Sequence, residues 1–207
     1  MGRRWRTTGT SVDGKAGARR GQTLVEFALV FPLFFTLVLG LIEFGFVFNA
    51  TLSVNYAARD AALAAAEAGN LNGADCVILK AVDSAVGSPS DDGRIVQIEI
   101  YQSNPNGGMI GSPTVYTRFG GLNAAPCANV DGSSVAYVQS ANGYPELSRC
   151  NILAGCDPID PADSVDNVAV RITYTHSWVT PLRNFIGGGP GGLSFDRSSV
   201  MRMEPVL

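Results

Sequence analysis

Hydrophobic and polar positions divide this chain into one long apolar segment near the N-terminus and a mixed remainder. From Phe27 to Phe48 the only charged residue is Glu43. A helix rises 1.5 Å per residue, so this segment would span about 33 Å, close to the thickness of a bilayer's hydrocarbon core. A buried core helix and a secretory signal are the alternatives. Core helices usually carry a polar stripe, and the apolar part of a cleaved signal is shorter. The pattern therefore predicts a transmembrane helix.

Two residues interrupt the apolar segment. Pro32 removes one backbone donor and can kink the helix, which membrane helices tolerate. Glu43 lies about one turn from the far end, so we expect its carboxylate to extend toward water at the membrane interface. The alternative is a polar contact with another helix in an assembly.

After Asn49 the sequence is rich in strong helix formers up to Gly69, which predicts one continuous helix over about residues 23–68. Leu52, Tyr56 and Leu63 fall on one face of its second half. Alanines form a stripe that either permits close packing or reflects helix propensity alone. The stripe consists of Ala58, Ala61, Ala62 and Ala65.

The remaining pattern predicts one short helix, over residues 74–86, and then strands. The expected strands are 94–103, 113–119, 134–139, 167–175 and 193–204, with loops rich in Gly, Pro and Asn at 104–113 and 187–192. Together these elements predict an α+β fold of pilin-like architecture. In it a long N-terminal transmembrane helix, extended by an amphipathic helix, packs on a small antiparallel β-sheet.

Charge is distributed unevenly along the chain. Residues 1–21 hold six basic side chains and one acidic side chain, whereas the whole chain has a net charge of −3. Basic residues before an apolar span keep the N-terminus in the cytoplasm, and an acidic remainder argues against nucleic-acid binding. We therefore expect a basic cytoplasmic leader (1–21), a transmembrane helix (22–48) and an exported domain (49–207).

All four cysteines lie in the part expected to be exported, where disulfides persist. They are Cys76, Cys127, Cys150 and Cys156. The first expectation is a Cys150–Cys156 bridge, which closes a short local loop, together with Cys76–Cys127. A bridge from Cys127 to Cys150 or Cys156 is the alternative. The chain has no C-x-x-C motif and only one histidine, so we expect no zinc site.

A search for catalytic residues finds no complete set. His176 lies at the end of an expected strand without acidic residues nearby in sequence, which argues against thiol catalysis. Four aspartates recur every three residues, without the spacing of a calcium loop, and two prolines among them favour a solvated acidic turn. These aspartates are Asp157, Asp160, Asp163 and Asp166. No phosphate loop or nucleophile elbow is present, so we expect no enzymatic activity and no cofactor.

The residues just before the apolar segment carry a second signal. Thr23 and Glu26 have the spacing of a capping box, which by itself predicts only the start of a helix. Gly21 adds to this. A glycine followed five residues later by glutamate, then by an aromatic residue and a long apolar helix, is the pattern of a type IV prepilin.

The segment from Gly21 to about Ala62 resembles the TadE-like family, pseudopilins of Tad (Flp) pilus systems. The motifs that match are Val25–Leu29, Pro32, Ile42–Gly45 and Asn55–Ala61. The C-terminal stretch is also similar, through Val168–Tyr174, Thr180–Leu182, a glycine-rich loop and Met201–Glu204. Residues 70–165 match no family that we can name.

The resemblance implies a minor pseudopilin that acts in assembly or initiation of a pilus used for surface attachment. It implies cleavage by a membrane prepilin peptidase between Gly21 and Gln22, which would make Glu26 the fifth residue of the mature chain. Its carboxylate would then pair with the N-terminal amine of a neighbouring subunit. Flp-type sites often place Tyr after the Glu, where this chain has Phe27.

The partners implied are the peptidase, other Tad pilins and pseudopilins, inner-membrane assembly proteins and the lipid bilayer. The alternative function is an uncleaved, membrane-tethered surface binding module or assembly scaffold.

Overall fold

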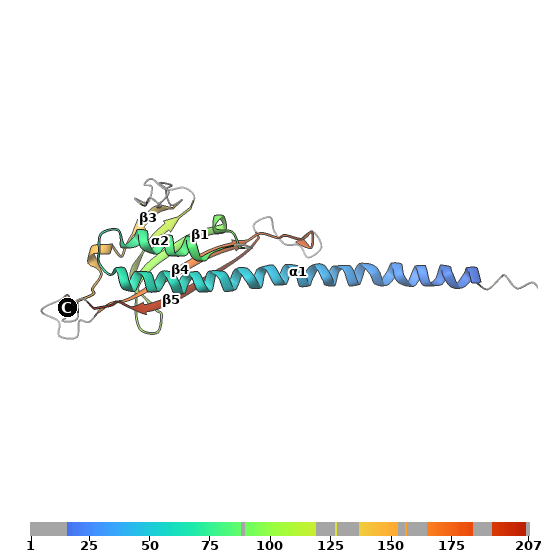
Figure 1. The fold of residues 1–207 in the computed structure, drawn as a ribbon, viewed down its shortest axis with the longest axis horizontal. Coiled ribbons are helices and arrows are strands. Elements are labelled where there is room, and N and C mark those ends of the chain that lie inside the picture. The colour runs from blue at the N-terminus through green and yellow to red at the C-terminus, as the bar shows by residue number, and fades with distance from the viewer. Residues whose placement is uncertain are drawn as a thin grey trace, which may run out of the picture. The chain divides into compact units, whose positions relative to one another are not determined.

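The structure is a computed structural model that describes residues 16–87, 90–118, 127, 137–152, 156, 165–183 and 192–205, with side chains from residue 21 onward. Its helices are α1 (Ala16–Ala68) and α2 (Ala74–Ala85), with 3-10 turns η1 (Asp92–Arg94) and η2 (Glu146–Ser148). Its strands are β1 (Ile95–Ser103), β2 (Met109–Thr117), β3 (Val138–Asn142), β4 (Asn167–His176) and β5 (Leu193–Arg202) (Figure 1). Residues 1–42 and residues 43–207 form separate units.

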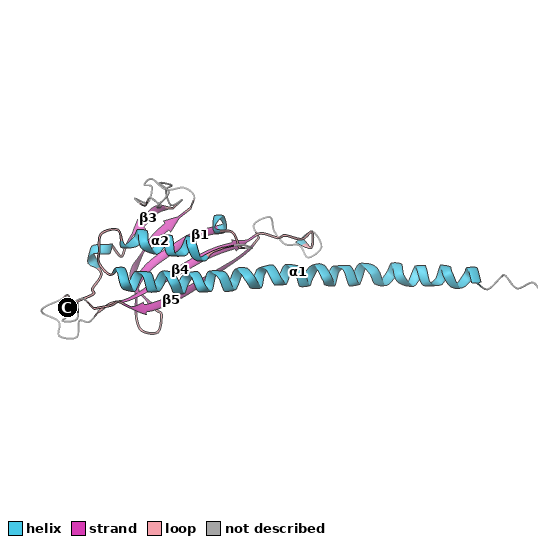
Figure 2. Cartoon of the chain, in the orientation of Figure 1, coloured by secondary structure: helices cyan, strands magenta, loops and turns pink. Residues whose placement is uncertain are grey.

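The second unit is built on one antiparallel sheet with the strand order β3-β2-β1-β4-β5 (Figure 2). In the middle of the sheet Ile98 of β1 lies opposite Tyr116 of β2 and Ile172 of β4. These three side chains belong to one buried core together with residues of α2 and of the part of α1 that follows Glu43. Both helices therefore cover one face of the sheet, and the α+β fold expected from the sequence is confirmed.

The alanine stripe of α1 is the face that packs. Ala58, Ala61, Ala62 and Ala65 are fully buried in the core, so the close-packing interpretation is confirmed. The face of Leu52, Tyr56 and Leu63 is 39%, 58% and 46% exposed, respectively, so it does not form the packed side of the helix. Small side chains let a helix lie close to a sheet that already carries isoleucine, valine and tyrosine.

A larger side chain on the alanine stripe should destabilise this packing. We expect Ala61→Leu to lower the free energy of unfolding by about 1–3 kcal/mol, because added methylenes in a packed core force neighbours to move. Ala64 lies on the same helix and is only partly buried, so Ala64→Leu should change stability by less than about 0.5 kcal/mol. Urea unfolding of the full chain in detergent measures both. Equal effects of the two changes would contradict the packing argument.

The end of α1, the helix α2 and the strands β1, β4 and β5 are confirmed to within about two residues, the usual uncertainty of element ends. The start of α1 is different. The helix already includes residues 16–22, so the interpretation of Thr23 and Glu26 as a capping box that begins it is wrong. α1 also continues through Pro32.

The connection between β1 and β2 is shorter than expected. The Asn104 side-chain oxygen accepts the N–H groups of Asn106 and Gly108 at 2.9 and 2.8 Å, and Gly107 has a φ of 87°. This tight turn lets β2 begin at Met109, so the expected loop over residues 104–113 is wrong in its second half. β3 begins at residue 138, whereas the strand was expected from residue 134. Residues 134–136 and most of the expected loop 187–192 lie outside the described residues.

Candidate functional site

The first unit consists of the N-terminal part of α1. In the described part of the chain, α1 is the one helix that is long and apolar enough to cross a membrane. Its side chains from residue 21 to residue 37 are exposed. An apolar surface of this extent is far larger than a soluble monomer presents to water, so it requires lipid or other helices around it.

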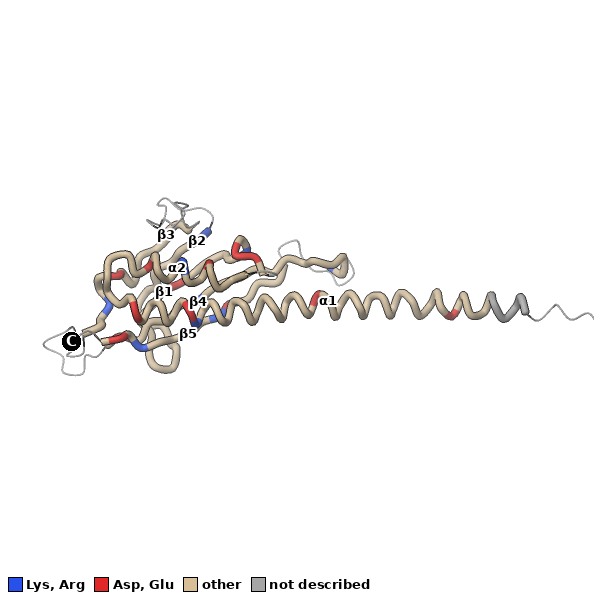
Figure 3. Tube along the Cα trace, viewed as in Figure 1, with Lys and Arg blue, Asp and Glu red and all other residues tan. Residues whose placement is uncertain are grey.

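The residues of the expected processing site lie on this helix. Gly21 is exposed, and no atom lies within 4 Å of the position where a Cβ would stand. Gln22 donates a side-chain hydrogen bond to Glu26 at 2.9 Å. Among the side chains described from residue 21 to residue 42, Glu26 is the only charged one (Figure 3). A lone carboxylate in an apolar helix is costly in lipid unless it is paired.

The second unit begins at Glu43, whose carboxylate is bound by the segment that follows β4. Glu43 is 3% exposed. It lies 3.0 Å from Nε2 of His176, and it accepts the N–H groups of Val179 at 3.1 Å and of Thr180 at 2.8 Å. We call this group the Glu43 clamp. Several N–H donors aimed at one buried carboxylate are what keeps such a charge stable away from water.

The Glu43 clamp corrects two expectations. The carboxylate does not extend toward water, and the groups that bind it belong to its own chain and not to another helix. His176 and Glu43 are 133 residues apart in sequence, so no local pattern connects them. A signal was nevertheless present, because Ile42–Gly45 and Thr180–Leu182 were both among the motifs that carried the family resemblance.

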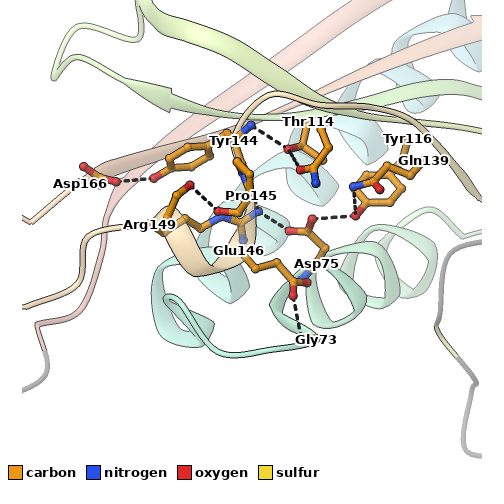
Figure 4. A network of polar contacts seen from close by, with 12 residues as sticks. Gly73, Asp75, Thr114, Tyr116, Gln139, Tyr144, Pro145, Glu146, Arg149 and Asp166 are labelled. Carbon is orange, nitrogen blue, oxygen red and sulfur yellow. Dashed lines mark hydrogen bonds and ion pairs between the residues drawn. The ribbon is translucent and has the colours of Figure 1, made fainter. Parts of the chain in front are cut away.

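A buried polar network fastens η2 to the start of α2 (Figure 4). Arg149, 1% exposed, donates to one oxygen of the Asp75 carboxylate, and the hydroxyl of Tyr116 donates to the other at 2.7 Å. The Glu146 carboxylate accepts the N–H groups of Gly73 at 2.8 Å and of Asp75 at 2.7 Å. These N–H groups at the start of α2 have no partner within the helix, so Glu146 acts as a cap supplied from elsewhere in the chain.

Asp166 is part of the same region and corrects a further expectation. It is 8% exposed, and it accepts the Tyr144 hydroxyl at 2.6 Å, the Cys150 N–H at 2.9 Å and the Gln102 side chain at 2.7 Å. Asp166 therefore holds the chain before β4 in place, and its assignment to a solvated acidic turn is wrong. Asp157, Asp160 and Asp163 lie outside the described residues.

Two disulfides join the cysteines. Cys76 on α2 is bonded to Cys127, and Cys150 is bonded to Cys156. This is the pairing placed first in the sequence analysis. The first bridge ties α2 to a part of the chain between β2 and β3, and the second closes a short loop beside Asp166. The first bridge therefore reinforces the attachment of α2, and the second reinforces the chain that follows η2.

A comparison with protein families identifies the N-terminal helix. Residues 21–63 match the family model described as TadE-like protein. The match begins at Gly21 and includes Glu26, Glu43 and most of the alanine stripe, so the family resemblance is confirmed for this TadE-like segment. No curated protein and no solved structure matches the chain.

Three buried tyrosines make the stability of this unit sensitive to alkaline pH. Burial raises the pKa of Tyr116, Tyr137 and Tyr144 well above the ordinary value, and a neighbouring carboxylate raises each further. The hydroxyl groups donate to Asp75, Asp83 and Asp166, respectively. A raised pKa means that the folded protein retains protons that the unfolded chain releases above about pH 10.

The tyrosines therefore stabilise the fold below about pH 10 and lose that contribution as the pH rises, by about 1.4 kcal/mol per pH unit for each tyrosine. Urea unfolding of the full chain in detergent, at a series of pH values from 8 to 11, measures this loss. Tyr144→Phe should reduce the slope by about one third, since one of the three groups is removed. A Tyr144→Phe chain whose stability falls with rising pH as steeply as that of the unchanged chain would contradict the prediction.

Proposed function

We propose that this chain is a membrane-anchored minor pseudopilin that acts in assembly or initiation of a Tad-type pilus. The observation that carries the proposal is the TadE-like match, which begins at Gly21 and covers the apolar helix. The exposed apolar surface of α1 supports the proposal, because such a helix can lie in lipid or pack against the helices of other subunits. Surface attachment would be the role of the completed fibre.

In the proposed mechanism a membrane prepilin peptidase cleaves between Gly21 and Gln22. Cleavage removes the basic leader, residues 1–21, from the cytoplasmic side and leaves a new amine on Gln22. Glu26 then becomes the fifth residue, and its carboxylate pairs with the amine of a neighbouring pilin or pseudopilin. A charge pair is less costly in an apolar environment than either charge alone, so the pairing would favour the correct register between subunits.

The rest of the proposed arrangement follows from the same orientation. Residues 22–48 would cross the inner membrane, and the folded domain, residues 49–207, would be exported. The disulfides Cys76–Cys127 and Cys150–Cys156 support this side of the membrane, because disulfides persist outside the cytoplasm. The partners would be the peptidase, other Tad pilins and pseudopilins, and inner-membrane assembly proteins.

A second candidate function is a permanent membrane-tethered binding module or assembly scaffold that is never cleaved. One observation favours it. α1 includes residues 16–22, so the bond between Gly21 and Gln22 lies within helical backbone, whereas proteolytic sites concentrate in exposed, irregular chain. Cleavage would require this turn of the helix to open in the peptidase.

The N-terminal residue of the protein extracted from membranes distinguishes the two candidates. Intact mass or terminal sequencing should give a mature chain that starts at Gln22, and deletion of the protein should reduce the number of pili. A chain that retains Met1 or Gly2 in cells with an active prepilin peptidase would refute processing. Normal pili in a clean deletion would refute the role in assembly.

A further inference from the structure

The segment that follows β4 presents apolar side chains beside the Glu43 clamp. This post-β4 segment comprises residues 177–183, and its backbone binds the Glu43 carboxylate through the N–H groups of Val179 and Thr180. Val179 donates its N–H to Glu43 while its side chain is 59% exposed. On α1, Phe44 and Phe48 are 67% and 53% exposed, and their rings stack 6.2 Å apart. The post-β4 segment and α1 therefore both expose apolar side chains close to Glu43.

The position of this surface relative to the membrane follows from the position of Glu43 on the apolar helix. Thr23–Ile42 is a predominantly apolar stretch with one charged residue, Glu26, and its length is about the 20 residues that a membrane span needs. The apolar run ends at Phe48, about 7.5 Å along the helix from Glu43 at 1.5 Å per residue. Glu43 therefore lies near the end of the span whichever of these residues marks its limit. The backbone of Val179 and Thr180, which is hydrogen-bonded to Glu43, must therefore also lie near the end of the span.

The Glu43 clamp also removes the usual obstacle to placing non-helical backbone near the end of the membrane span. Loops are excluded from lipid because their free N–H and C=O groups have no water to bind. Here the carboxylate binds the N–H groups of Val179 and Thr180, and the hydroxyl oxygen of Thr180 accepts the Leu182 N–H at 3.4 Å. The backbone N–H groups of Val179, Thr180 and Leu182 are therefore bound within the protein, and the Val179 side chain is left exposed.

The composition of the post-β4 segment fits the boundary between lipid and water. Trp178 is half-buried, and tryptophan is enriched where membranes meet water. Arg183 is exposed four residues after Val179, where a long cationic side chain can reach the phosphate groups. Apolar residues next to a tryptophan and a terminal arginine are typical of segments that lie in a membrane surface without crossing it.

We propose that the post-β4 segment is a second membrane contact, in which Trp178 and Val179 lie among the lipids at the end of the α1 span, held there by the Glu43 clamp. The occupant of this surface is the lipid bilayer, since the surface is continuous with the apolar helix. The contact would fix the distance between the sheet and the membrane through two attachments instead of one. It rests on the membrane span and is independent of a role in a pilus.

Fluorescence quenching by lipids with brominated acyl chains tests the contact. The chain has two tryptophans, Trp5 and Trp178, so Trp5→Phe leaves Trp178 as the only indole. The full chain with this change is reconstituted into vesicles. The control position is Leu147, which lies on η2 and is 77% exposed. The control chain combines Trp5→Phe, Trp178→Phe and Leu147→Trp, so its one indole is at position 147. A third chain carries Val179→Trp in the same background.

We expect brominated lipids to quench Trp178 and the Val179→Trp probe about twofold or more above the Leu147→Trp control, because only side chains in the membrane surface meet the acyl chains. Equal quenching of all three probes would overturn the proposal. These measurements leave the Glu43 clamp intact, so they do not depend on the folding of a clamp variant.

The role of the clamp is tested by Glu43→Ala, with Glu67→Ala as the control, since Glu67 is an exposed glutamate on the same helix. Glu43→Ala should lower quenching of Trp178 to the level of the Leu147→Trp control, and Glu67→Ala should leave it unchanged. A Glu43→Ala chain with unchanged disulfides, helix content and Trp178 quenching would show that Glu43 does not hold the segment. Strong quenching supports the contact whether or not the chain is cleaved at Gly21, because the contact rests on the membrane span and not on a role in a pilus.

Discussion

Replacing Arg149 by alanine should lower the free energy of unfolding by about 3–5 kcal/mol, the range typical of a buried ion pair that loses one partner. The side chains of Arg149 and Asp75 are 0% and 6% exposed. Without the guanidinium, the Asp75 carboxylate would lose its ion-pair partner at a site nearly closed to water, where the Tyr116 hydroxyl would still donate to it. The loss should also loosen η2 from the start of α2, since Glu146 caps that helix from the same turn.

Arg171 is a matched control for this experiment. Its guanidinium carbon lies 5.2 Å from the ring centroid of Tyr101, the same distance as that of Arg149 from Tyr144. It also pairs with a carboxylate, Glu99 at 3.0 Å, but its side chain is 34% exposed. Water can take the place of the Arg171 guanidinium, so Arg171→Ala should lower the free energy of unfolding by no more than about 1 kcal/mol.

Urea unfolding of the full chain in detergent, under oxidising conditions, gives both values. A cost for Arg149→Ala that equals the cost for Arg171→Ala would show that burial of the Arg149–Asp75 pair contributes nothing. A double variant, Arg149→Met with Asp75→Leu, should regain stability, since an apolar pair of similar volume leaves no charge unpaired. Such a result would support the loss of the ion-pair partner as the cause.

The elements that the sequence predicted well are those with a strong local period. β1 and β4 alternate between buried and partly exposed positions around Ile98 and Ile172, and α1 combines a long apolar run with strong helix formers. Such patterns depend only on the residues themselves, because side chains repeat every two positions in a strand. β2 was harder to predict, since its start depends on a turn made by Asn104 and Gly107.

The packed face of α1 shows why amphipathicity can mislead. Large apolar side chains dominate a hydrophobic pattern, and the pattern therefore indicated the face of Leu52, Tyr56 and Leu63. The sheet instead packs against alanines, whose contribution comes from a close approach of backbones rather than from their own apolar area. Which face packs is decided by the shape of the sheet, and that information lies elsewhere in the sequence.

The polar contacts were beyond sequence reasoning for a related reason. Glu43 is bound by residues 133 to 137 positions later in the chain, and Arg149 reaches Asp75 over 74 positions. Each partner alone looks like an ordinary surface charge or an isolated histidine. Only the fold brings the donors to the carboxylates, and burial then makes each pair strong.

A leucine in place of Gly21 should prevent maturation if the proposed processing occurs. A peptidase that cleaves between Gly21 and Gln22 must approach the backbone closely, and glycine permits this because it has no side chain. We expect cleavage of Gly21→Leu to slow by about tenfold or more, which corresponds to about 1.4 kcal/mol or more in the barrier. The full-length precursor should accumulate in the membrane, as read by intact mass, and pili should be lost.

Gly45→Leu separates a processing defect from damage to the helix. Gly45 is also exposed on α1, and no atom lies within 4 Å of the position of its absent Cβ, as for Gly21. Both changes replace glycine by a better helix former at an unobstructed site, so neither should destabilise α1. If Gly45→Leu matures normally and Gly21→Leu does not, the requirement is specific to the proposed bond. If both mature at the same rate, cleavage does not depend on Gly21, and the proposed bond between Gly21 and Gln22 is not the processing site.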